Sequence, residues 1–197
     1  MNIVRTVAAS FALSLTVVVA LSQQTVSTAA SPAVRSMERK LEHIEINGKR
    51  LTPDSTPTVL TEDEVNAYVN SGAVNLPRGV RRVRLAGMPG VVTADMQVDF
   101  DQITQASRPM NPLLALFSGM HEVRVATHAH GQGGVGYVHV DRVSLDNVEV
   151  PPIALEFFID RYIKPKHPEI GLDTHFQMPD RIDTAVAGQR QVTLVQK

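Results

Sequence analysis

The sequence predicts an α+β fold in which a highly curved antiparallel β-sheet packs on short apolar helices. Apolar and polar residues alternate with a period of two in several stretches joined by Gly-containing turns, a pattern typical of antiparallel hairpins. Two short apolar helices are expected, one after each of the first two hairpins. The hydrophobic residues, 43% of the chain, are dominated by Val, Leu, Ala and Ile, and the β-branched members favour strands.

Composition restricts the classes of function. The 197 residues are enough for one domain with its own core, and a formal net charge of −1 offers no basic surface for nucleic acid. The chain has no cysteine, which excludes a disulfide framework and any thiolate-based metal or nucleophile site.

Residues 1–30 are predicted to form an export signal. Arg5 precedes an uncharged, mostly apolar segment at 6–22, and small residues suit cleavage after Ala30 or Ser22. The alternative is an uncleaved membrane anchor, because the uncharged run 6–34 is long enough to cross about 30 Å of hydrocarbon. Either way, we expect the folded part outside the cytoplasm, in the periplasm or cell envelope.

Residues 31–58 are expected to form a helix and a linker ahead of a curved-sheet domain at 59–197. The helix is predicted over 31–44, where it either packs on the domain or acts as a stalk. Residues 44–50 then alternate as in a strand, and two prolines within 51–58 indicate a loop. The apolar residues at helical spacing are Val34, Met37, Leu41 and Ile44.

The next elements are a capped helix and a hairpin. Thr61 and Glu64 form a capping box, so a helix is predicted to begin there and to end near Gly72. Asn66 within it is interpreted as a structural side chain, because no base or nucleophile lies at a helical neighbour position. Residues 79–101 then predict a hairpin whose Arg and Asp residues pair across its polar face.

A second hairpin is predicted over 122–140. Its Gly-rich turn spans 131–136, and the shifted apolar phase that follows indicates bulges at 141–142 and 146–147. A closing pair of strands is predicted within 182–195.

Two apolar helices follow these hairpins. Asn111 and Pro112 are an N-cap and N1 pair that starts the first, and Pro152 starts the second, which runs to Lys164. The second helix has a single narrow polar stripe, so protein must cover one side and either protein or a ligand the other.

Seven histidines raise a metal hypothesis. His128, His130 and His139 on one strand face could hold zinc, as in a metal-dependent hydrolase, but a solvated strand end is the preferred interpretation. The glycines at 131–136 join two strands, so they offer no helix N-terminus to a phosphate. No nucleophile elbow and no H-E-x-x-H motif occurs, so we expect no enzymatic activity.

The remaining feature is a surplus of apolar side chains. If the two helices lie side by side against the sheet, they line a groove that an acyl chain could fill, and a well-filled core uses the same residues. The predicted groove residues are Leu113, Leu114, Leu116, Phe117, Ile153, Leu155, Phe157, Phe158 and Ile159.

Four segments resemble the LmeA-like, tubular lipid-binding (TULIP-like) group of small bacterial envelope proteins. They are LTEDEVNAYVN at 60–70, NLPRGVRRVRL at 75–85, VSLDNVEVPPIALEFFI at 143–159 and FQMPDRIDTAVAGQRQVTLVQ at 176–196. The resemblance implies that 59–197 is a lipid-binding-like domain, half of a lipid-binding tube that holds phospholipid or another acyl-chain lipid, and it implies no cofactor.

We therefore expect an exported, non-enzymatic lipid-binding protein, serving envelope lipid transport or homeostasis and associating with a membrane. The alternative is a structural or interaction module of the cell envelope with a dry, packed core.

Overall fold

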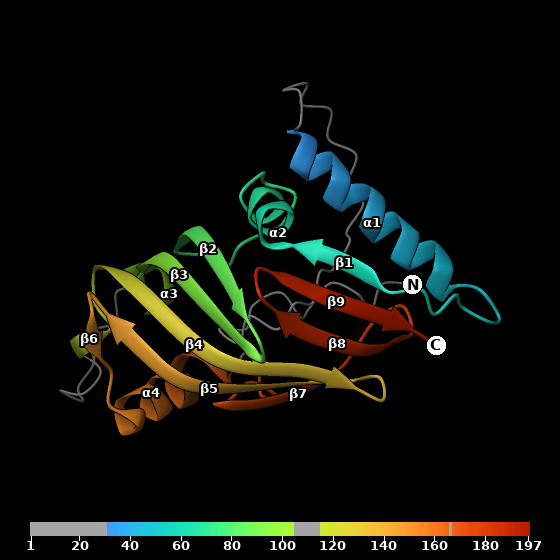
Figure 1. Cartoon of the computed structure of the whole chain (residues 1–197). Helices are drawn as coiled ribbons and strands as arrows, with labels where there is room; N and C mark the ends of the chain where they lie inside the picture. The colour runs from blue at the N-terminus through green and yellow to red at the C-terminus, as the bar shows by residue number, and fades with distance from the viewer. Residues whose placement is uncertain (1–30, 105–114, 166) are drawn as a thin grey trace.

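A long hairpin of β4 (Met120–Gln132) and β5 (Val135–Leu145) is the spine of the sheet (Figure 1). The computed structural model describes residues 31–104, 115–165 and 167–197. One edge of β4 pairs with β5, whereas the other pairs with β3 and then, at His130 and Gly131, with β8. A single strand therefore joins two parts of the sheet.

The other strands extend this hairpin, and all pairs are antiparallel. The order is β1-β9-β8-β4-β3-β2, with β6 and β7 on the outer edge of β5. The α+β class with a large antiparallel sheet is thus confirmed, and the half-tube stays a prediction. The bounds are β1 (Thr58–Thr61), β2 (Val80–Met88), β3 (Val91–Asp99), β6 (Val148–Glu149), β7 (Asp173–Gln177), β8 (Ile182–Gly188) and β9 (Gln191–Gln196).

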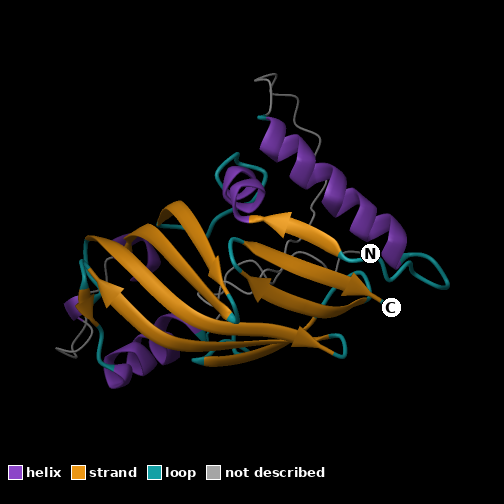
Figure 2. Ribbon diagram, in the orientation of Figure 1, coloured by secondary structure: helices purple, strands orange, loops and turns teal. Residues whose placement is uncertain are grey.

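The helices gather at two ends of the sheet (Figure 2). α1 and α2 lie at the end formed by β1, β8 and β9, and α4 lies at the end formed by β6 and the start of β4 (Figure 1). The helices are α1 (Pro32–Gly48), α2 (Glu62–Val69), α3 (Phe100–Thr104) and α4 (Pro152–Phe158), which continues as a π-helical turn, η2 (Ile159–Ile163).

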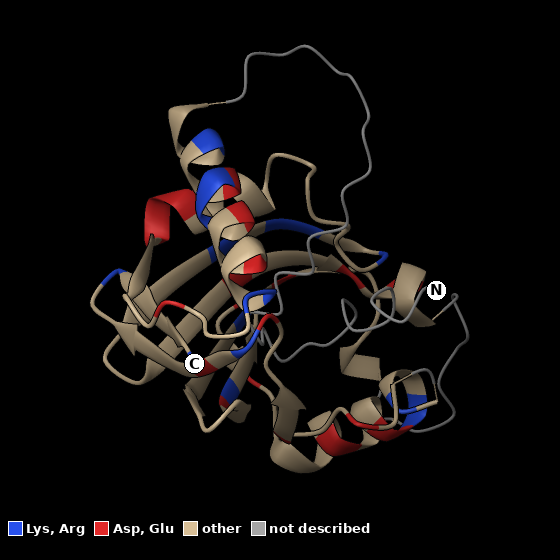
Figure 3. Cartoon of the chain, turned by 90° about the vertical axis from the view of Figure 1, so that its right-hand side faces the viewer, with Lys and Arg blue, Asp and Glu red and all other residues tan. Residues whose placement is uncertain are grey.

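The first helix is longer than predicted, and the strand predicted at 44–50 is wrong. Ile44 continues the buried stripe of α1. Asn47, about one turn later, is also buried, and its side-chain amide bonds the loop after α1 and the end of β9. Asn47 Nδ2 donates to Asp54 O at 2.8 Å and to Gln196 Oε1 at 2.9 Å. With Met37 fully buried, α1 packs on the sheet and is not a stalk; its outer face carries both charge signs (Figure 3).

The second hairpin departs from its prediction at the turns. The bulge at Asp141 is confirmed, because the register with β4 shifts between Arg142 and Val140. The bulge predicted at 146–147 is wrong: both residues adopt positive φ and form the two-residue turn between β5 and β6. Gly131 and Gly136 pair within the strands, so the turn is only Gly133-Gly134.

A buried carboxylate joins α1 to the start of α2. The capping box is confirmed, since Thr61 Oγ1 accepts from Glu64 N and Glu64 Oε2 accepts from Thr61 N. Glu64 also accepts hydrogen bonds from Lys40 Nζ at 2.7 Å and from Ser36 Oγ at 2.6 Å. Burial alone would raise the pKa of Glu64, but the bonds from Lys40, Ser36 and Thr61 outweigh it and lower this pKa from 4.5 to about 2.

We predict that Glu64→Gln lowers the free energy of unfolding by about 2 kcal/mol at pH 7, because the ionised form makes the stronger bonds. A lowered carboxyl pKa stabilises the fold above pH 4.5, and this contribution is lost as the pH falls toward about 2. Urea unfolding across this range should show the two proteins converging at low pH. Glu38→Gln, on the exposed side of α1, is the control. A gap that stays constant with pH would contradict the assignment.

Candidate functional site

Four of the predicted groove residues meet beneath α4. Phe117, Leu155, Phe158 and Ile159 face the inner side of β4 and β5 around a hollow of only about 20 Å³. Phe100 completes an aromatic cluster there: its ring centroid lies 5.4 Å from that of Phe117 and 5.5 Å from that of Phe158. Phe117 and Phe158 stack at 4.3 Å. The space beneath α4 is therefore filled by protein side chains.

Three other predicted groove residues lie at the surface. Ile153 is 56% exposed, Leu116 is 44% exposed and Phe157 is 43% exposed. Leu113 and Leu114 lie outside the described residues. The structure thus brings four of the predicted groove residues together, and these four lie in a packed core.

A larger apolar pocket lies at the opposite end of the molecule, between α1, α2 and the sheet. Its volume is about 120 Å³, its lining is mostly apolar, and it is partly open to solvent. Helix residues line one side and strand residues the other. Among them are Leu41, Ile44, Leu60, Val65, Val192 and Leu194.

Small residues explain why this end is hollow. Gly131 and Gly136 lie opposite each other in β4 and β5, and Ala185 and Ala187 belong to the inner face of β8. A Cβ atom at Gly136 would lie 2.3 Å from the ring of Phe176, so this ring packs directly on the backbone. Phe176 and Met178 fill the space directly over Gly136 and Gly131, and the short side chains of Ala185 and Ala187 leave the pocket beside them.

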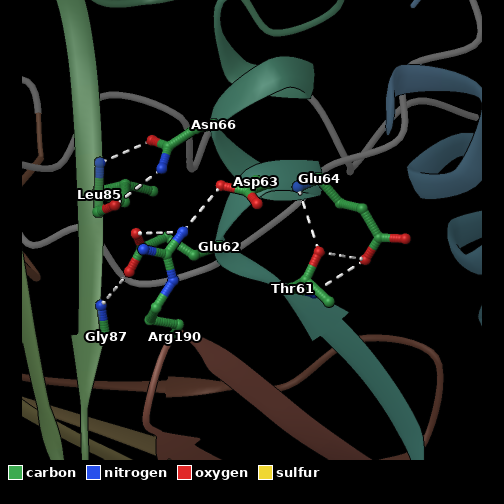
Figure 4. A network of polar contacts seen from close by, with 8 residues as sticks. All are labelled: Thr61, Glu62, Asp63, Glu64, Asn66, Leu85, Gly87 and Arg190. Atoms are coloured by element: carbon green, nitrogen blue, oxygen red, sulfur yellow. Dashed lines mark hydrogen bonds and ion pairs between the residues drawn. The ribbon is translucent and has the colours of Figure 1, made fainter. Parts of the chain in front are cut away.

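Glu62, which lines the pocket, is engaged in structural bonds (Figure 4). Glu62 accepts a hydrogen bond from Gly87 N at 3.1 Å and lies 3.5 Å from Arg190, which also pairs with Asp63 at 3.1 Å. Asp180 also lines the pocket, and burial is the main cause that raises its pKa. No pair of free carboxylates therefore faces this cavity within the described residues.

The histidines of the metal hypothesis lie on the outer face of β4 and β5. His128 Nδ1 bonds Asp141 at 2.7 Å, His139 Nδ1 bonds Asp173 at 2.6 Å, and the ring of His130 stacks on Tyr137. The hydrogen bond to Asp173 is the main cause that raises the pKa of His139. The described part of the chain contains no group of three or more side chains placed to hold a metal ion.

Comparison of the chain with protein-family models, curated proteins and solved structures gives no match. The resemblance to tubular lipid-binding proteins therefore stays a prediction. Among the described residues, no helix is both long and apolar enough to span a membrane.

Sequence reasoning missed the pocket because it searched for large apolar residues. The signal that could have found it is the opposite one, namely glycine and alanine at inward positions of strands: Ala129, Gly136, Ala185 and Ala187.

We predict that Phe158→Ala costs about 3 to 5 kcal/mol of unfolding free energy, because it empties the centre of the aromatic cluster. Phe157→Ala, one residue earlier in α4, should cost less than about 1 kcal/mol because that residue is 43% exposed and does not line the hollow beneath α4. Urea denaturation of both variants measures the difference. Equal losses would show that α4 does not bury the face described above.

Proposed function

We propose that this chain is an exported, non-enzymatic lipid-binding protein that takes the end of an acyl chain into the pocket between α1, α2 and the sheet. The observation that carries the proposal is this pocket of about 120 Å³, with its mostly apolar lining and its opening. Dry apolar cavities of about 150 Å³ hold ligands as large as benzene. A cavity of this size takes a short length of hydrocarbon, so the remainder of the lipid extends through the opening.

The placement of the ligand differs from the groove inferred from the sequence. α4 covers a filled core, and the proposed binding site lies at the α1–α2 end of the sheet, where Ala185 and Ala187 line the pocket. Export itself rests on residues 1–30, which lie outside the described part of the chain.

A structural or interaction module of the cell envelope is the second candidate. The tight packing beneath α4, with a hollow of only about 20 Å³, favours it at that end of the molecule. The two candidates differ in whether the larger pocket is occupied when the protein is isolated.

We predict that Val192→Phe weakens binding of a fluorescent fatty acid at least about tenfold, because the ring fills the pocket. Val186→Phe is the matched control: it makes the same change on the neighbouring strand, where Val186 is 56% exposed on the outer face. Probe titration and mass spectrometry of co-purified lipid are the measurements. A wild-type protein that carries no lipid and takes up no probe refutes the function, whereas equal binding by wild type and Val192→Phe refutes the pocket.

A further inference from the structure

A polar hollow of about 280 Å³ lies on the outer face of the sheet, away from the apolar pocket. It forms where β2, β3, β4 and β5 run side by side. The register places Arg84 opposite Asp95, Asp95 opposite Arg124, and Arg124 opposite Ser144. Directly opposite residues lie on the same face of a sheet, so these four side chains form one row across four strands. We call this site the arginine hollow; Arg82, Gln97, Glu122 and Asn147 also line it.

A bulge in β2 brings an additional arginine to this face. The register with β3 shifts between Arg81 and Arg84, and Arg82 adopts a positive φ of 50°. As a result Arg81 and Arg82 are both exposed, while the following Val83 stays buried in the core. A non-glycine residue rarely adopts this conformation, and bulges commonly re-aim side chains. Here the bulge directs the side chain of Arg82 to the hollow.

One of the three arginines that line the hollow forms an ion pair with a carboxylate of the hollow, and the other two do not. Arg124 Nε donates to Asp95 Oδ1 at 2.5 Å, so the carboxylate between the two arginines is used by Arg124. Arg82 and Arg84 form no ion pair within the described part of the chain. Three guanidinium groups against the carboxylates of Asp95 and Glu122 leave a net positive charge, with two guanidinium groups available to a ligand.

We propose that the arginine hollow binds the phosphate group of a phosphate ester. A guanidinium group presents its N–H donors in a planar fork that matches two phosphate oxygens, so Arg82 and Arg84 are the primary ligands. The Ser144 hydroxyl and the side-chain amides of Gln97 and Asn147 supply further donors at the edge of the site. Asp95 keeps Arg124 in position. This site does not depend on the apolar pocket, because the two lie on opposite faces of the sheet.

The test is calorimetric titration of the purified chain with inorganic phosphate and with glycerol 3-phosphate at low ionic strength. We expect Arg84→Gln to raise the Kd about tenfold and Arg82→Gln/Arg84→Gln to abolish binding, since each removes a charge-assisted hydrogen-bond donor. Arg81→Gln is the matched control, because Arg81 is an exposed arginine on the same strand that does not line the hollow. Asp95→Asn should tighten binding, because it removes a repelling charge.

A second arm identifies the source of the phosphate. Co-sedimentation is measured with vesicles of phosphatidylglycerol and with vesicles of phosphatidylcholine. Binding of soluble phosphate that the double variant loses supports the site for a free phosphate ester. Binding only to phosphatidylglycerol vesicles, lost in the double variant but kept in Arg81→Gln, supports it for a lipid headgroup. Absence of both, equal loss in Arg81→Gln, or equal binding of sulfate or single-stranded DNA would overturn it.

Discussion

The free edge of β2 is closed by side chains of α2, and this contact sets the position of both helices above the sheet. Asn66 Oδ1 accepts from Leu85 N at 2.7 Å, and Asn66 Nδ2 donates to Leu85 O at 2.8 Å (Figure 4). One side-chain amide thus supplies both bonds that a neighbouring strand would make. Asn70 Nδ2 adds a bond to Val83 O at 2.6 Å. Since an unpaired sheet edge is costly to bury and prone to aggregation, this capping lets α2 cover the edge of β2.

The same helix begins directly at the end of β1, the strand at the other edge of the sheet order. α2 therefore contacts both ends of the sheet, and α1 is held against α2 through Lys40 and Glu64. Because polar bonds hold α1 and α2 in place, these helices need not pack against the sheet until apolar side chains fill all the space between them. This explains how a pocket persists at one end, whereas at the other end the rings of Phe100, Phe117 and Phe158 fill the space under α4.

Local signals in the sequence predicted most elements, and tertiary contacts account for the differences. The capping box at Thr61 and the proline at position 152 act within one helical turn, so both helix starts are confirmed. The short strands β1 and β7 were not predicted, because their pairing partners are distant in sequence. The pocket between α1, α2 and the sheet was not predicted for a similar reason. Large apolar residues mark a core and a groove alike, and the pairing of β4 with β8, which brings small residues beneath these helices, joins strands that are distant in sequence.

Strand β4 is common to the apolar pocket and the arginine hollow. Ala129 lines the pocket on the inner face, and Arg124 lines the hollow on the outer face. Residues of opposite parity on one strand point to opposite faces, and the register shift between Ala126 and Thr127 lies between the two positions. The bulge at Asp141 absorbs that shift on β5, so the two sites are adjacent along one strand yet separated by the thickness of the sheet.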